Sequence, residues 1–276
     1  MLRNIIILSL AFFISIPAAL SKTDKSSAEY LKNKKHFSIF NPVAESVVQK
    51  AIKKSLKKST GENFKVKFDG YTLYSLKQGI FKNLELEGND FQINGIDVKY
   101  LKLKSLTNYN KINYSQKPLT IETDMVYSYE MHLTEQSLNQ ALESKEYKKI
   151  LEKVNNKTYP LFALYGAFIN IKNNKLQIIM EYNFPIAPNK KNKQLKVTTG
   201  VKVDRNKIST SDIAIDNSCG VLPPDRITNL INILDPLTFT LNLMNTKKCN
   251  TRIENVKIID NIIQINGKIY VKGGDK

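Results

Sequence analysis

Glu130 and His132 are the two residues whose types and spacing come closest to acid–base chemistry in this chain. They lie two positions apart in a stretch that alternates apolar and polar side chains, so a strand would place both on one face. A carboxylate beside an imidazole could exchange a proton with a bound substrate. Alternatively, the two residues are ordinary solvated neighbours on the solvent-exposed face of a strand, and we favour that interpretation.

The rest of the sequence offers little that catalysis or a cofactor would need. It has two histidines, and it lacks a His-Glu-x-x-His motif, a Gly-x-Ser-x-Gly elbow, a glycine-rich phosphate loop and a metal-spaced Cys/His cluster. Carboxylate pairs such as Glu122/Asp124 alternate with apolar residues, as solvent-facing strand positions do. We therefore predict a protein that is not an enzyme, with no catalytic residue, no metal and no cofactor. An envelope-lipid hydrolase or transferase that uses Glu130 and His132 is the weaker alternative.

Cys219 and Cys249 are the only cysteines of the chain. In an oxidising compartment such a pair forms a disulfide, which would stabilise the fold by about 3–4 kcal/mol for a loop of this length. A redox-active pair would be a close Cys-x-x-Cys, and a metal site would need further ligands. We predict a structural disulfide between the two.

Residues 1–21 have the composition of a secretory signal peptide. Arg3 supplies the positive charge, Ile5–Ile16 is almost wholly apolar, and Pro17 precedes small residues with a cleavage position after Ser21. The alternative is an uncleaved anchor, but the apolar segment is shorter than the about 20 residues that a membrane span needs. We predict an exported protein of the periplasm, the cell envelope or the extracellular space.

The formal net charge of +17 predicts an acidic partner. An exported chain meets anionic lipid head groups or acidic envelope polymers rather than nucleic acid. Lysines are spread throughout and arginines are scarce, which suits diffuse attraction better than bidentate phosphate recognition. We predict an anionic membrane surface as a partner and no nucleic acid; a charge that serves solubility alone is the alternative.

An amphipathic helix over Asn41–Ser59 follows a flexible leader at 22–40. Asn41 is its N-cap, Pro42 occupies the first helical position and Gly61 is the stop. The apolar arc is predicted to contain Val43, Ala44, Val47, Val48, Ala51, Ile52 and Leu56. The opposite arc carries the candidates for a basic or head-group-binding face, Lys50, Lys53, Lys54 and Lys57. A basic amphipathic helix can lie on a membrane, but we favour one that packs its apolar face on the core.

Residues 119–133 alternate apolar and polar side chains over fifteen positions. We predict one strand of about 50 Å, long enough to force the sheet to twist and curve. Further alternation predicts strands within 64–68, 84–86, 91–93, 96–103, 161–171, 176–184, 195–203, 237–243, 253–259 and 262–271. Further helices are expected within 134–142, 147–154 and 223–234. Strands that follow one another through short turns indicate a single α+β domain over 41–272 with an antiparallel sheet.

The inward-facing residues are rich in methionine and tyrosine. Methionine adapts to irregular partners and tyrosine joins an apolar body to a polar tip, so such a surface suits acyl chains. An ordinary core packed on the helix would use the same residues, and both interpretations stand. The candidates for a lipid groove are Val48, Ile52, Leu119, Ile121, Met125, Tyr127, Tyr129, Met131, Ile178, Met180, Tyr182 and Phe184.

Four motifs carry a resemblance to a known family. They are Gly-Ile-Phe-x-Asn-Leu-x-Leu-x-Gly at 79–88, Gly-Ile-x-Val at 95–98, Leu-Thr-Glu-Gln-Ser-Leu-Asn-Gln-Ala-Leu at 133–142 and an ending at 256–267 with Asp260 and Gly267. In this order they resemble the DUF2993, or LmeA-like, family of exported bacterial phospholipid-binding proteins.

The resemblance implies a fold similar to the tubular lipid-binding (TULIP) proteins, in which a curved antiparallel sheet wraps on a long helix and encloses a lipid-sized groove. It implies no catalytic residue. We therefore expect a monomeric, non-enzymatic protein of the bacterial envelope that binds or transfers a phospholipid or another acyl lipid. The alternative is an envelope scaffold with a self-filled core and a basic surface for acidic polymers or partner proteins.

Overall fold

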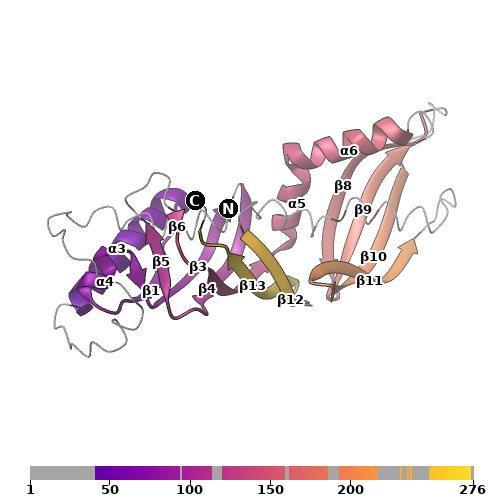
Figure 1. Cartoon of the computed structure of the whole chain (residues 1–276). Helices are drawn as coiled ribbons and strands as arrows, with labels where there is room; N and C mark the ends of the chain where they lie inside the picture. The colour runs from indigo at the N-terminus through magenta and orange to yellow at the C-terminus, as the bar shows by residue number, and fades with distance from the viewer. Residues whose placement is uncertain are drawn as a thin grey trace.

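The computed structural model describes residues 41–93, 95–113, 120–158, 162–185, 193–216 and 249–274, and the single positions 231, 235 and 237 (Figure 1). Within this part the chain is α+β and rich in strands, and its strand pairs are antiparallel, which confirms the predicted class. The predicted signal peptide, leader, Leu119, Cys219 and most of 223–243 lie outside the described residues.

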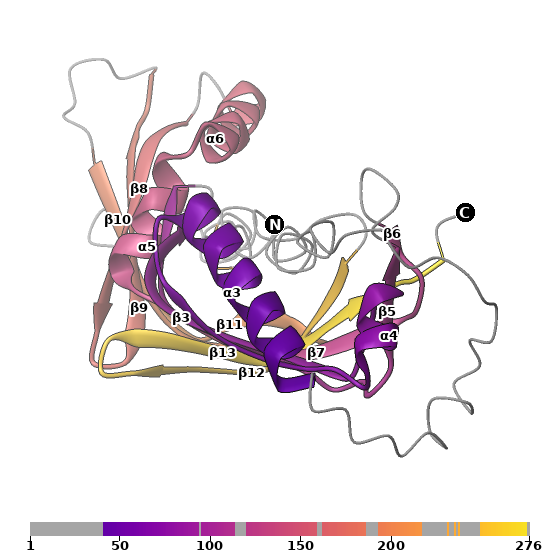
Figure 2. The same cartoon turned by 90° about the vertical axis from the view of Figure 1, so that its left-hand side faces the viewer.

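The larger sheet has six strands in the order β1-β3-β4-β7-β13-β12. Their bounds are β1 Phe64–Asp69, β3 Asn83–Ile93, β4 Ile96–Ser105, β7 Met125–Leu133, β12 Cys249–Ile259 and β13 Ile262–Val271. Helix α3, Asn41–Thr60, lies on the hollow side of this curved sheet (Figure 2) and makes its main contacts with β1 and β3. Burial alternates strictly along β7, so one face of the sheet is apolar and covered.

A second sheet stands beside the first with the order β11-β10-β9-β8 (Figure 1). Its strands are β8 Ala163–Lys172, β9 Lys175–Asn183, β10 Lys193–Asp204 and β11 Lys207–Asp216, and its helices are α5 Glu135–Glu143 and α6 Lys145–Thr158. A small third sheet joins β2 Ile80–Phe81, β5 Asn110–Asn113 and β6 Thr120–Ile121 next to the short helix α4, Leu73–Lys77. Buried side chains of both large sheets belong to one continuous apolar cluster.

Helix α5 holds the two large sheets together. On one side, the Gln140 amide bonds both the backbone N–H of Asp97 in β4 (2.7 Å) and the Asp97 carboxylate (2.8 Å). On the other, the Asn139 amide bonds the N–H and the carbonyl of Ile169 in β8, at 2.8 and 2.9 Å. The two bonds of Asn139 to the backbone of Ile169 copy the pattern of a neighbouring strand. The Asn-Gln pair of the Leu-Thr-Glu-Gln-Ser-Leu-Asn-Gln motif therefore has a structural role.

The outer edge of β8 is also protected by helix side chains that hydrogen-bond its backbone groups. Glu135 of α5 accepts a hydrogen bond from the N–H of Ile171 at 2.7 Å. Asn155 of α6 bonds the N–H and the carbonyl of Leu164, both at 2.8 Å. An edge strand presents unpaired backbone groups that invite association with other chains. Side chains from α5 and α6 occupy these groups along β8.

The predicted single strand over 119–133 is wrong, because the chain bends at 122–124 and divides into β6 and β7. The side chain of Thr123 accepts from the N–H of Lys111 at 2.8 Å, and that of Asp124 accepts from Gly273 at 2.8 Å. Polar side chains that bond backbone groups compete with strand pairing in this way. β6 consequently pairs with β5, whereas β7 lies between β4 and β13.

The predicted apolar arc of α3 is correct at Val48, Ile52 and Leu56, which are buried, and wrong at Val43 and Val47. Those two valines are 63% and 57% exposed. A helix turns about 100° per residue, so Val43 lies about half a turn away from Ile52. The two valines therefore share the outer face of α3 with its lysines.

Two cross-strand pairs of an aromatic ring and a glycine let neighbouring strands approach closely. Tyr129 of β7 faces Gly267 of β13, and Phe64 of β1 faces Gly88 of β3. A Cβ atom on Gly267 would lie 2.1 Å from the carbonyl oxygen of Arg252 and 2.8 Å from the Tyr129 ring. One on Gly88 would lie 2.4 Å from the Phe64 ring. Such pairs are associated with curved sheets, where the ring covers the backbone that glycine leaves bare.

Candidate functional site

Most of the predicted groove residues lie on the inner faces of the two large sheets and on the buried face of α3; Ile121 lies on β6 of the small third sheet and Phe184 directly after β9. Ile121 and Phe184 are partly buried, and Leu119 lies outside the described residues. The others are at most 6% exposed: Val48, Ile52, Met125, Tyr127, Tyr129, Met131, Ile178, Met180 and Tyr182. These side chains therefore line the interior, as predicted, and they are closely covered.

The structure divides these candidates between two regions. Met125, Tyr127 and Met131 share the inner face of β7 with Tyr129, and the Tyr127 hydroxyl donates to the Met125 sulfur at 3.5 Å. Ile178, Met180 and Tyr182 lie on β9 in the second sheet. There Tyr182 packs against Phe184 with ring centroids 5.6 Å apart. Phe162 completes the aromatic group at 5.2 Å from Tyr182.

The apolar inner face of the larger sheet is wider than the strands on which α3 mainly rests. α3 contacts chiefly β1 and β3, and α5 contacts β4 and one part of β7. The face continues through β7 to β13, where Ile263, Ile265 and Ile269 are fully buried. Register pairs Ile265 with Met131 and Ile269 with Tyr127. Methionine, tyrosine and isoleucine thus form one apolar surface on two adjacent strands.

Tyr129 brings a polar atom into this apolar surface. Its side chain is 4% exposed, and its hydroxyl has no hydrogen-bond partner in the part of the chain that the structure describes. Burial, with a smaller contribution from the Glu254 carboxylate, raises the pKa of Tyr129 above its usual value. The hydroxyl is therefore a protonated donor without an acceptor. Nothing in the sequence distinguishes Tyr129 from the other alternating tyrosines.

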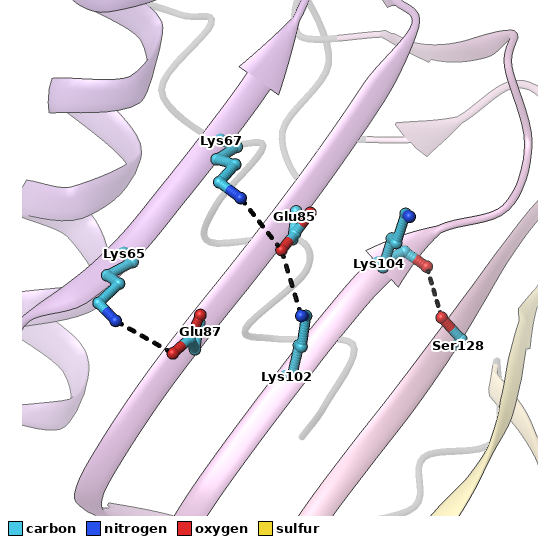
Figure 3. Close-up of polar contacts among 7 residues, drawn as sticks. All are labelled: Lys65, Lys67, Glu85, Glu87, Lys102, Lys104 and Ser128. Atoms are coloured by element: carbon cyan, nitrogen blue, oxygen red, sulfur yellow. Dashed lines mark hydrogen bonds and ion pairs between the residues drawn. The ribbon is translucent and has the colours of Figure 1, made fainter.

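The outer face of the same sheet is a ladder of charged pairs (Figure 3). Lys65 lies 3.2 Å from Glu87, and Lys67 and Lys102 each lie 3.6 Å from Glu85. Cross-strand pairs of opposite charge stabilise a sheet weakly, by about 0.2–1 kcal/mol each. This face is a solvated surface on which Lys65, Lys67 and Lys102 have carboxylate partners.

Glu130 and His132 lie on this outer face, as predicted. The imidazole Nε2 is 2.9 Å from the Glu130 carboxylate, and the His132 ring lies 4.9 Å from the ring of Tyr100. Burial, followed by the charge of Glu87, raises the pKa of Tyr100. The pair opens on a shallow hollow of about 330 Å³. The hollow is lined by Asn89, Asp90, Lys99, Tyr100, Glu130, His132 and Ile262.

The hollow combines residues that the sequence does not bring together. Asp90 has a φ of 50° and forms an ion pair of 2.6 Å with Lys99 across the β3–β4 hairpin. The hollow offers carboxylates, an amine and an imidazole to solvent, and its lining contains no Ser, Thr or Cys side chain. Among the described residues there is no group of three or more His, Cys, Asp and Glu side chains that could hold a metal.

The predicted basic face of α3 is exposed at all four positions, Lys50, Lys53, Lys54 and Lys57. Cys249 begins β12 opposite Val271, and its disulfide with Cys219 stays a prediction because Cys219 lies outside the described residues. No helix in the described ranges is long and apolar enough to cross a membrane.

Comparisons of the chain with protein-family models, with curated proteins and with solved structures find no match. The resemblance to the LmeA-like family therefore stays a prediction. What the protein does has to be argued from its own residues and their geometry.

Proposed function

We propose that the protein binds a lipid, and that the acyl chain lies against the apolar inner face of β7 and β13. The observation that carries the proposal is the width of that face, which continues beyond the strands that α3 mainly contacts. An apolar face of this width offers contact to an acyl chain once the parts of the molecule that bury it move aside. The finer architecture, a sheet wrapped around a helix as in the tubular lipid-binding proteins, belongs to this proposal.

The surface is more than long enough for an acyl chain, and its side chains suit one. The nine residues of β7 extend over about 30 Å, which is about twice the contribution of one leaflet to a 30 Å bilayer core. Met125 and Met131 stand at the two ends of β7 and can adjust to ligands of different shape. The Tyr129 hydroxyl between them would donate to an ester carbonyl of the lipid, which would complete its hydrogen bonding.

Because the inner side chains are buried, lipid entry requires an element next to this face to shift, and we propose that this element is α3, which rests on the β1–β3 side of the sheet. The described polar contacts between α3 and β1 or the turn after it are few. The Glu45 carboxylate accepts from the N–H of Gly70 at 2.8 Å, and the Gln49 amide donates to the Phe68 carbonyl at 3.3 Å. The remaining interface is apolar, centred on Ile52 and Leu56. Apolar contacts are non-directional, so an acyl chain would replace them with little loss.

The predicted signal peptide and the excess of lysine support a bacterial envelope as the location of this activity. We propose a monomer that carries a phospholipid or another acyl lipid between or along membranes and performs no catalysis. Glu130 and His132 stand on the opposite face of the sheet from the proposed lipid, so they have no part in binding its acyl chain.

The test is to purify residues 22–276 from cells and to extract the protein with organic solvent for mass spectrometry. About one lipid per chain is expected, or its uptake when the delipidated protein is mixed with phospholipid liposomes. An inward substitution, Met131→Glu, should abolish loading, whereas the outward control Val126→Glu on the same strand should retain it. The variants are compared only where circular dichroism shows that both are folded.

The close covering of Met125, Tyr127 and Met131 favours a second function. In that case the sheet is filled by its own core, and the protein is an envelope scaffold whose basic surface binds an acidic polymer or a partner protein. The same extraction separates the two functions, because a scaffold would yield no stoichiometric lipid and take up none from liposomes.

A further inference from the structure

We infer that the outer stripe of α3, formed by Val43, Val47, Lys50, Lys54 and Lys57, docks the protein on an anionic membrane surface. The inference rests on the proposed function only where it identifies this stripe as the surface through which a lipid carrier meets its membrane. The docking itself is a separate property with its own test.

The five residues form one narrow stripe along the helix. Taking about 100° per residue, they fall within about 40° of a common line, and that line lies opposite the buried Ile52. From Val43 to Lys57 the stripe extends about 21 Å along the axis, at about 1.5 Å per residue. The burial of Ile52 and Leu56 fixes the rotation of α3 on the sheet, so the stripe is already turned to solvent.

The two valines set this stripe apart from an ordinary solvated helix face. They are 63% and 57% exposed, on the far side of the helix from the core. Both stand in its first two turns, and the lysines follow. A flat approach to a bilayer would place the valines at the boundary of the acyl region, about 5–10 Å deep, while the lysine stems reach back to the head groups.

The lysines of the stripe have no ion-pair partner among the described residues, in contrast to several lysines of the sheets. Within the described part of the chain Lys50, Lys54 and Lys57 form no ion pair, whereas Lys65, Lys67, Lys99, Lys102, Lys111 and Lys268 each have a carboxylate partner. The single acidic residue of α3, Glu45, points to the sheet and bonds Gly70. The helix therefore presents positive charge without a neighbouring negative one, which attracts an anionic surface.

The combination favours a membrane over an acidic polymer. A soluble polyanion would be held by the lysines alone, and its binding would vanish in high salt. Exposed valines in line with the lysines contribute only where an apolar phase is available. The stripe predicts that the N-terminal end of α3 goes deeper into the bilayer than the lysine-bearing end.

The experiment is sedimentation of the full secreted chain with vesicles of phosphatidylglycerol and phosphatidylcholine, compared with phosphatidylcholine alone. Each lysine near an anionic surface contributes roughly fivefold in partitioning, so Lys50→Gln/Lys54→Gln should weaken binding about 25-fold. The matched control Lys149→Gln/Lys153→Gln removes two exposed lysines at the same spacing on α6 and should change binding less than about twofold. Val43→Ser/Val47→Ser should lower binding at least about fivefold, including in high salt.

Three results would overturn the inference. The α6 control could lose as much binding as the α3 variant, the valine variant could bind like the parent, or the parent could show no preference for anionic vesicles. A valine variant that binds normally while dextran sulfate competes fully would point to an acidic polymer instead. Lipid that co-purifies without docking removes this inference alone, and docking without any bound lipid removes the proposed function alone.

Discussion

Gly267→Ala should destabilise the protein strongly, because the neighbours of β13 leave no room for a side chain at this position. The added Cβ atom would lie 2.1 Å from the carbonyl oxygen of Arg252, which is backbone of the adjacent strand β12. It would also lie 2.8 Å from the ring of Tyr129. The ring can tilt, but the carbonyl belongs to the irregular pairing around Ile253 and Asn255 and cannot retreat without breaking the β12–β13 ladder.

The magnitude follows from these two contacts. Overpacking a well-filled interior costs about 1–3 kcal/mol, and a backbone clash belongs at the upper end. We expect a loss of about 3 kcal/mol, a large part of the roughly 5–15 kcal/mol that stabilises a typical domain. With a urea m-value of about 3 kcal/mol/M, the unfolding midpoint would fall by about 1 M.

The assay is urea unfolding followed by circular dichroism, with two comparisons. Gly166→Ala on β8 is the control, since its Cβ atom would meet nothing within 4 Å, and its stability should stay within about 0.5 kcal/mol of the parent. Tyr129→Leu/Gly267→Ala should recover only the part of the loss that comes from the ring. A Gly267→Ala protein as stable as the Gly166→Ala protein would refute the close-approach reasoning.

Three further predictions concern named side chains. Tyr129→Phe removes a buried hydroxyl without a described partner, so the free energy of unfolding in urea should stay equal or rise by up to about 1 kcal/mol; a clear loss would reveal a hydrogen bond. Asn139→Ala leaves the N–H and carbonyl of Ile169 unpaired and should cost about 2 kcal/mol, while the exposed control Asn156→Ala should cost almost nothing. Burial raises the pKa of Tyr147, so its stabilising contribution is complete below pH 10 and is lost as the pH rises above about 10, by about 1.4 kcal/mol per pH unit. Tyr147→Phe should make thermal unfolding less sensitive to pH between pH 9 and 11, and an unchanged slope would contradict the assignment.

Local patterns predicted the regular elements well. Strict alternation identified the buried face of β7, and the Asp260-Asn261 turn between β12 and β13 follows from residues that accept positive φ, here 50° and 61°. The helix that starts after Thr134 was predicted from its cap, and the structure shows a full capping box there with Ser137. In each case the determining contacts lie within a few residues of one another.

Features that depend on distant partners were not predictable. The bend at 122–124 needs Lys111 and Gly273, which are remote in sequence. The strand β11 has few large apolar residues and is held mainly by its register on β10. The alternation of residue types within 119–133 gives no sign of this bend, because Glu122, Thr123 and Asp124 fit the alternation as well as strand residues do.

Errors and omissions in the candidate site have similar causes. Val43 and Val47 were assigned to the apolar arc by residue type, although their angular position places them with the lysines. The hollow beside His132 needs the β3–β4 hairpin to bring Asp90 and Lys99 next to β7. Whether the apolar interior holds a ligand depends on how completely the protein's own side chains fill it. The alternation pattern is the same for a lipid-binding interior and for a self-filled core.

The most direct test of lipid binding is mass spectrometry of the protein purified from cells under conditions that keep non-covalent ligands bound. We expect a mass increment of one lipid per chain that disappears after organic extraction and returns on incubation with liposomes. A chain that shows only its own mass before extraction and after incubation would contradict it, and would favour the scaffold with a self-filled core.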